Sequence, residues 1–388
     1  MVFKRFEVLV LAPIILLTLI FRIPSFFEPA WYGDEMIRLV VAKEWFGGAT
    51  LYSEIFDNSP PLLYLIFGLA PDLFWLKFLA FIWAATAAIV FYLLAKKFAK
   101  NFKLGKIYPV LAVAIFILLT STPIFEGNIA TAEIFILAPV ISAMFLVWEE
   151  NFGSKPFLPI LAGILASAAT MVRIQALTDL AAVAVFLIFF KNFKSVFGVF
   201  GGFFLVWVAI FLIFFSTGNW PSFASSVFLG NFDYVNYANQ LFFPLGLLIL
   251  KVFLTIFVLA ILFQFKNFFT KFEIFIIIWL TLSFLGVSIG GRGFPHYLLQ
   301  ITPAVSLLIA TIVRKRVLDF AKIFVFLIIF VSFFSLGQFY LPKTFSYYRN
   351  FLTNFARDDD YKNWFGERVV QSETIANYIL SKTSAEDK

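Results

Sequence analysis

The 388-residue chain is 62% hydrophobic and only 14% charged, and 57 of its residues are phenylalanine. Its mean hydropathy of +0.93 excludes an ordinary soluble domain, in which roughly 45–50% of the residues are apolar. The absence of cysteine excludes disulfide and thiolate chemistry, and the formal charge of +7 does not indicate a nucleic-acid partner, because most basic residues lie in short loops between apolar segments.

The apolar segments predict an all-α polytopic membrane protein, since open sheet edges would leave backbone groups unpaired in lipid and the alternation of a β-barrel is missing. The first segment, residues 6–23, follows Lys4 and Arg5. The residues after it are too bulky for a signal-peptide cleavage site, so we expect an uncleaved first span with a cytoplasmic N-terminus. The polar interval 31–61 would then lie outside.

The apolar segment 62–70 is too short to cross, because a spanning helix needs about 20 residues. We expect it to be a half-embedded helix within an outer first loop, residues 24–72. The five lysines between residues 96 and 106 then lie inside, as the positive-inside rule requires. About 11 transmembrane helices are predicted, at residues 6–23, 73–94, 107–120, 134–147, 157–171, 176–190, 196–215, 241–263, 274–289, 296–313 and 320–341.

This topology divides the chain into two parts. Residues 1–341 are expected to form a membrane module, and residues 342–388 a short extracytoplasmic tail, which is either the start of a missing soluble domain or the end of a chain that lacks one. The unusual polar residues are expected at the outer ends of the spans, where a cavity opening to the outer leaflet would gather them. They are Asp34, Glu35, Asp57, Asn58, Glu126, Asn128, Glu133, Arg173, Arg292 and His296.

Asp34 and Glu35 are the first candidates for chemistry. Neighbouring residues on a helix point roughly 100° apart, so only one of these carboxylates can face a given site. Asp34 could act as a general base in a partly dry cleft, where burial raises the pKa of a carboxylate. It stands at the start of a helical-looking run, so it could equally be an N-cap.

Arg173, Arg292 and His296 are the candidate cations. A charge at mid-bilayer costs about 2.5–3.5 kcal/mol, so Arg173 either snorkels to the interface or binds an anion, for which a lipid-linked phosphate is the obvious choice. Arg292 and His296 lie in a glycine-containing turn that allows close backbone approach, although a lone histidine at a helix start can be purely structural. Glu133 at the start of a span is explained equally well by the helix dipole. A divalent metal at His296 has no HxxxH or HxxE spacing to support it, so no metal site is assigned.

Five motifs in one order carry a resemblance to a known family. They are GDEMIRLVVAKEWFGGATLY with Asp34 and Glu35, DNSPPLLYL with Asp57 and Asn58, ATAEIFIL with Glu133, MVRIQA with Arg173, and HYLLQITPAVSLL with His296. In these motifs the chain resembles the GT-C glycosyltransferases, in the branch that contains protein O-mannosyltransferases and lipid A aminoarabinose transferases. The similarity covers most of residues 31–308.

The resemblance implies an inverting enzyme that transfers a sugar from a polyprenyl-phosphate carrier to an acceptor at the outer membrane face. Asp34 matches the family's catalytic aspartate and would take the proton from the acceptor hydroxyl. The DNSPP step differs from the EKPP form of aminoarabinose transferases, which speaks against that acceptor class. The residues expected to bind substrate are Glu35, Asp57, Asn58, Glu133, Arg173, Arg292 and His296. The sugar donor is a substrate, and no cofactor is assigned.

Two other classes stay open: a secondary transporter and a catalytically silent GT-C-like subunit. Transporters place coupling charges near the bilayer midplane in broken helices, whereas these charges gather at one face. A silent subunit is expected to have lost the Asp34–Glu35 pair. The expected partners are membrane lipid, the lipid-linked donor and an acceptor protein, lipid or glycan, and the expected location is the plasma membrane of a bacterium or archaeon.

Overall fold

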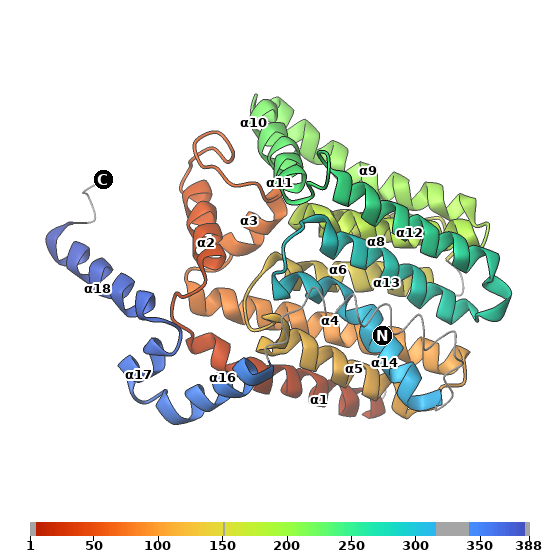
Figure 1. Cartoon of the computed structure of the whole chain (residues 1–388), viewed down its shortest axis with the longest axis horizontal. Coiled ribbons are helices and arrows are strands. Elements are labelled where there is room, and N and C mark those ends of the chain that lie inside the picture. The colour runs from red at the N-terminus through yellow and green to blue at the C-terminus, as the bar shows by residue number, and fades with distance from the viewer. Residues whose placement is uncertain (1–4, 150–151, 316–340, 385–388) are drawn as a thin grey trace.

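The computed structural model describes residues 5–149, 152–315 and 341–384 (Figure 1). These residues form helices joined by short turns, with two isolated β-bridges and no β-strand among them. The all-α prediction is therefore confirmed for the described part of the chain. The eleventh expected span, residues 320–341, lies outside it apart from its last residue.

Ten apolar helices occupy the first ten segments predicted to cross the membrane, and those labelled α1, α4, α5 and α9 run roughly along the horizontal axis of Figure 1. They are α1 (Arg5–Arg22), α4 (Leu73–Asn101), α5 (Ile107–Ser121), α6 (Ala132–Val147), α7 (Phe157–Val172), α8 (Leu177–Phe189), α9 (Phe193–Ser216), α12 (Gly246–Gln264), α13 (Lys271–Ile289) and α14 (Thr302–Lys315), the last preceded by the 3-10 helix η6 (Pro295–Ile301).

Six of these described segments are long and apolar enough to cross a membrane on their own. They are Val10–Phe27, Leu73–Asn101, Phe193–Ser216, Gly246–Gln264, Lys271–Ile289 and Pro295–Val313. The helices α5, α6, α7 and α8 are apolar but shorter. A multi-pass integral membrane protein is therefore confirmed as the class, while the number of crossings stays a prediction.

Two glycines let α7 pack closely against α9, and this contact fixes the place of α7 in the bundle. A Cβ at Gly163 of α7 would lie 1.9 Å from the Val199 carbonyl oxygen, and one at Gly202 of α9 would lie 2.0 Å from the Ile160 carbonyl oxygen. Small residues let the two backbones approach, which is how helices associate in lipid, where the hydrophobic effect does not drive them together. The end of α7, where Arg173 follows, is placed by this contact.

The first loop and the tail lie at the same end of the bundle, on the left of Figure 1. The loop contains the 3-10 helix η1 (Ile23–Phe27), α2 (Gly33–Phe46) and α3 (Pro61–Gly68). With eight residues, α3 is too short to cross a bilayer. The tail forms α16 (Leu341–Asn354), α17 (Asp358–Asn363) and α18 (Glu367–Lys382).

A second group of short helices covers the same end. These are the 3-10 helices η2 (Pro123–Phe125) and η3 (Ile174–Ala176), then α10 (Trp220–Ala224), the π-helix η4 (Ser225–Leu229) and α11 (Gly230–Ala238). The 3-10 helix η5 (Lys266–Phe268) lies elsewhere, between α12 and α13.

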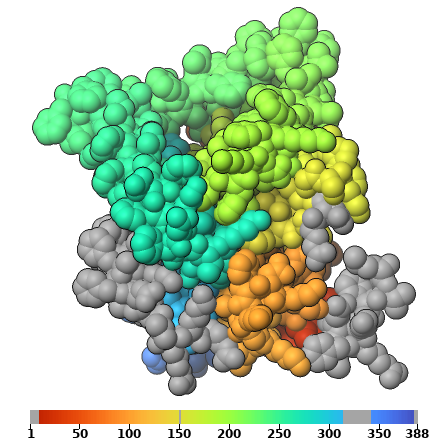
Figure 2. All heavy atoms as spheres, turned by 90° about the vertical axis from the view of Figure 1, so that its right-hand side faces the viewer, coloured from red at the N-terminus to blue at the C-terminus, as the bar shows by residue number. Residues whose placement is uncertain are grey.

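The opposite end of the bundle faces the viewer in Figure 2, with the end of α4 in orange and the α12–α13 junction in teal. The last turn of α4 carries Lys100, and Lys271 begins α13. Lysines in the turns at this end agree with the orientation expected from the positive-inside rule. Which end faces the cytoplasm stays a prediction.

Candidate functional site

A cavity of about 430 Å³ opens at the end of the bundle that carries the first loop. Its walls come from the start of α2, the turn before α3, the end of α7 with η3, α11, and the segment that leads into η6. Its volume falls in the range of sites that bind small molecules, roughly 300–1,000 Å³. The polar residues and aromatic residues that line it include Tyr32, Asp34, Arg38, Asn58, Arg173, Gln175, Asn231, Tyr234, Arg292, His296 and Tyr297.

Asp34 lies in the first turn of α2, and its side chain is 50% exposed at the cavity. Its Oδ2 accepts a hydrogen bond from Arg38 Nη2 at 3.1 Å, one helical turn away. The N-cap of α2 is Tyr32, so the alternative in which Asp34 caps this helix is wrong. The exposed part of the Asp34 carboxylate can contact a molecule in the cavity, while the hydrogen bond from Arg38 fixes the orientation of the carboxylate.

Arg173 does not snorkel, because its side chain is only 14% exposed and pairs with Glu133. Its guanidinium also lies over the Tyr297 ring, 4.4 Å from the centroid. In the structure its anion is a protein carboxylate, and the expected contact of Arg173 with a lipid-linked phosphate stays a prediction. Glu133 is buried at the start of α6, so its main contact is this pair and not the solvent.

His296 is held between two carboxylates. Its Nδ1 lies 2.7 Å from Glu126 Oε2, and its Nε2 lies 4.0 Å from Glu133 Oε1. The Tyr32 hydroxyl approaches the same Nδ1 at 3.3 Å. Burial and the Glu126 carboxylate raise the pKa of Tyr32 well above its usual value, so this side chain stays a neutral phenol. The imidazole thus has a fixed position at the cavity wall.

Arg292 is the cation of the cavity that faces solvent. It is exposed, and its guanidinium lies 4.8 Å from the Tyr234 ring centroid. Within the described ranges no carboxylate forms an ion pair with it. An anion entering the cavity would therefore meet an uncompensated charge at Arg292, whereas the charge of Arg173 is already balanced by Glu133.

Glu35 is placed away from the cavity, so the structure does not support its expected contact with substrate. It is 2% exposed and lies 2.8 Å from Lys77 Nζ, and its Oε1 accepts the Ala130 N–H at 2.5 Å. Neighbouring residues on a helix point in different directions, so Asp34 of α2 faces the cavity while Glu35 faces α4. Glu35 therefore stabilises the junction of the loop with the bundle.

Asp57 also lies outside the cavity lining, in contrast to the expectation that it binds substrate. Its Oδ1 accepts the backbone N–H of Asn58 at 2.7 Å, an arrangement that stabilises the turn before α3. Asn58 does line the cavity, and its carbonyl oxygen accepts from Asn231 Nδ2 at 2.8 Å. Asp57 shapes the turn that places Asn58.

Sequence reasoning missed Arg38 and Lys77. The spacing of four residues from Asp34 is the signal that could have found Arg38, since side chains at i and i+4 are neighbours on a helix. Lys77 stands inside an apolar run, where a charge needs a partner. Its Nζ lies 2.8 Å from Glu28 Oε2 as well as from Glu35 Oε1.

Glu28 is the centre of a buried network behind the cavity. Its carboxylate accepts hydrogen bonds from Trp31 Nε1 at 2.9 Å, Asn128 Nδ2 at 2.7 Å and the Tyr347 hydroxyl at 2.6 Å, in addition to Lys77. Tyr347 belongs to the tail, so this network ties α16 to the first loop. It stabilises the fold, because the buried Glu28 carboxylate accepts from all four donors.

Among the described residues, no group of three or more His, Asp or Glu side chains is arranged to hold a metal ion. No family model and no curated protein matches the chain. Fold and site thus define a multi-pass helical membrane protein with a polar cavity at one end of its bundle.

Proposed function

We propose that the protein is a membrane glycosyltransferase that moves a sugar from a polyprenyl-phosphate donor to an acceptor, with inversion at the anomeric carbon. The observation that carries the proposal is one cavity lined by a half-exposed carboxylate, Asp34, and an uncompensated guanidinium, Arg292. Transfer from a sugar phosphate needs both, a base for the acceptor and a cation for the leaving phosphate.

The reaction assigns one role to each of these side chains. The acceptor hydroxyl oxygen forms a bond to C1 of the sugar while its proton passes to Asp34. The bond between C1 and the phosphate oxygen breaks, and its electron pair leaves with the polyprenyl phosphate. Arg292 stabilises the charge on that phosphate. No acid is required, because the phosphate is a good leaving group.

The remaining cavity residues position these groups. Arg38 holds the Asp34 carboxylate through its hydrogen bond. Glu133 fixes Arg173, which stacks on Tyr297, and Glu126 fixes His296. Asn58 offers a side chain to the sugar or acceptor from the turn before α3. The acceptor, either a hydroxyl or a phosphate on a protein, lipid or glycan, enters at the outer membrane face in this proposal.

The proposal is tested by presenting the purified protein with a panel of polyprenyl-phosphate sugars and measuring released polyprenyl phosphate by mass spectrometry. We expect turnover with at least one donor and a loss of about 10²–10⁴-fold in Asp34→Asn, the usual contribution of a positioned general base. Full transfer in Asp34→Asn would remove the mechanism. No turnover with any donor would favour a transporter or a silent subunit.

A further inference from the structure

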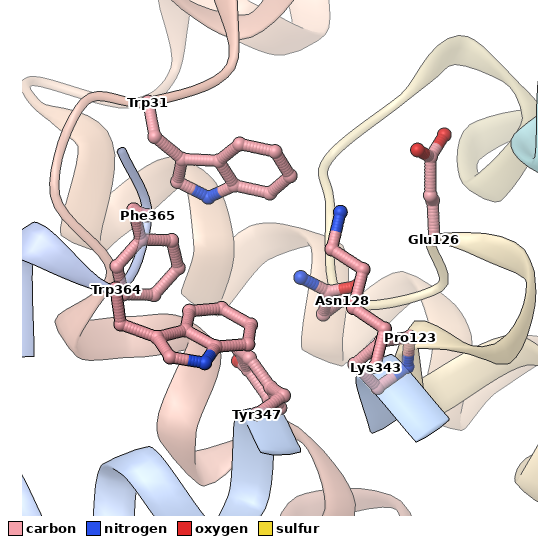
Figure 3. A pocket seen from close by; sticks show the side chains of 8 residues that line it. All are labelled: Trp31, Pro123, Glu126, Asn128, Lys343, Tyr347, Trp364 and Phe365. Atoms are coloured by element: carbon pink, nitrogen blue, oxygen red, sulfur yellow. The ribbon is translucent and has the colours of Figure 1, made fainter. Parts of the chain in front are cut away.

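A second, smaller cavity of about 110 Å³ lies where the tail meets the first loop (Figure 3). Three distant parts of the chain build it: the segment before α2, the turn around η2, and the tail, through α16 and the turn after α17. We call it the aromatic pocket. Its lining consists of Trp31, Pro123, Glu126, Asn128, Lys343, Tyr347, Trp364 and Phe365.

Aromatic rings form one side of the aromatic pocket. The Trp31 and Phe365 ring centroids are 5.7 Å apart, those of Trp364 and Phe365 5.0 Å, and those of Tyr347 and Trp364 5.9 Å. Figure 3 shows these rings across the pocket from the polar side chains of Lys343, Asn128 and Glu126. A ligand that fits must therefore offer an apolar face to one wall and polar groups to the other.

Asn128 supplies a polar group without a partner. The side chain is 3% exposed, and its Nδ2 donates to Glu28 Oε1 at 2.7 Å. Its Oδ1 has no hydrogen-bond partner among the described residues. Leaving a buried acceptor unsatisfied costs about 1–3 kcal/mol, and because Oδ1 has almost no accessible area, only a hydroxyl seated directly against the Asn128 side chain would satisfy it.

The lining of the pocket carries one charge of each sign, Lys343 and Glu126, so it has no net charge that would select a charged ligand. Lys343 Nζ lies 5.5 Å from the Trp31 ring centroid and already occupies the cation–π position over that ring. A neutral ligand can instead accept from Lys343 and donate to Glu126 and Asn128.

We propose that the aromatic pocket binds one neutral sugar ring, with C–H groups on the aromatic wall and hydroxyls on the polar wall. A water molecule needs about 10–15 Å³ of cavity volume. The 110 Å³ of the aromatic pocket therefore hold on the order of eight waters, which is comparable with the size of one pyranose ring. The pocket is too small for an oligosaccharide chain to enter as a whole.

The aromatic pocket adjoins the larger cavity, which suggests a role for a sugar bound there. Glu126 lines the pocket and contacts His296 Nδ1, which lines the larger cavity. Trp31 lines the pocket, and its neighbour Tyr32 lines the cavity. A glycan with one ring in the pocket could extend its next residue toward Asp34. This role as an acceptor subsite rests on the proposed transferase function, but sugar binding itself does not.

The test is saturation-transfer NMR on the purified full chain with the methyl glycosides of glucose, galactose, mannose and N-acetylglucosamine. We expect ring C–H signals from at least one glycoside and a roughly tenfold weaker affinity in Trp364→Ala, since one aromatic face is lost. Trp364→Phe keeps a face and should keep binding. Trp364→Leu fills the volume without a π face, so it shows the loss even if the alanine variant fails to fold.

The matched control is Phe345→Ala, an aromatic on the same helix as Lys343 that is 76% exposed and does not line the pocket. It should bind the glycoside as the wild type does. Asp34→Asn should also bind it, which separates this inference from the proposed transfer reaction. Binding of no glycoside, equal binding in Trp364→Leu, or Trp364-dependent binding of tetramethylammonium or inorganic phosphate instead would each overturn the proposal.

Discussion

Two groups of charges begin at the adjacent residues Asp34 and Glu35, and their surroundings differ. In the buried network, Lys77 is 1% exposed and contacts both Glu28 and Glu35 at 2.8 Å. At the cavity, Asp34 is half-exposed and Arg292 has no carboxylate partner among the described residues. Charges that satisfy one another hold the loop to the bundle, whereas charges that face an open cavity are available to a ligand.

The largest effect on stability is expected from Lys77→Met. The substitution removes the cation between Glu28 and Glu35 and leaves two buried carboxylates unpaired, and breaking a buried pair costs about 3–5 kcal/mol. Thermal unfolding in detergent measures the effect. Lys97→Met is the matched control, because its pair with Glu149 is partly exposed and should contribute at most about 1 kcal/mol. Equal effects of the two variants would contradict the distinction between the two groups.

The next largest effect is expected on the transfer rate of an Arg292 variant. Arg292→Gln removes the charge that we propose meets the donor phosphate, and a hydrogen bond to a charged group contributes about 1.5–3 kcal/mol, which corresponds to a loss of about 10- to 150-fold in kcat/KM for transfer. The unfolding temperature should not change, because the side chain is exposed. Arg292→Lys should recover part of the rate, since it restores the charge without the planar guanidinium. An unchanged kcat/KM in Arg292→Gln would show that the phosphate lies elsewhere.

The smallest effect is expected from Arg38→Gln. Its pair with Asp34 is solvent-exposed on one side, and such i,i+4 pairs contribute about 0.3–0.5 kcal/mol to stability. We expect a lower transfer rate from the less restrained carboxylate and almost no change in unfolding. A rate as low as that of Asp34→Asn would instead make Arg38 a catalytic residue in its own right.

Much of the fold follows from the sequence because apolar length and loop charge report directly on membrane helices. The ten apolar helices lie where the hydrophobic segments predict them, and α3 is short as its Pro60–Pro61 start and the short apolar segment 62–70 predict. The gathering of Asp34, Arg173, Arg292 and His296 around one cavity also agrees with the expected sidedness. Their roles in transfer stay predictions.

The sequence does not show which charged residues pair with each other, because the pairs form between distant segments of the chain. Nothing local distinguishes Glu35 from Asp34, yet only Glu35 meets Lys77 of α4. Nothing near Arg173 in the sequence shows that Glu133, 40 positions earlier, neutralises it. The aromatic pocket needs the tail to fold against residue 31, a contact that no motif indicates.

The most direct measurement compares Asp34→Asn with Glu35→Gln in purified protein, with transfer from a polyprenyl-phosphate sugar and thermal unfolding measured on the same samples. We expect Asp34→Asn to unfold like the wild type and to transfer almost no sugar. Glu35→Gln should unfold at a lower temperature, while its folded fraction still transfers sugar. Normal transfer by Asp34→Asn, or normal unfolding together with lost transfer in Glu35→Gln, would contradict the assignment of chemistry to Asp34 and of structure to Glu35.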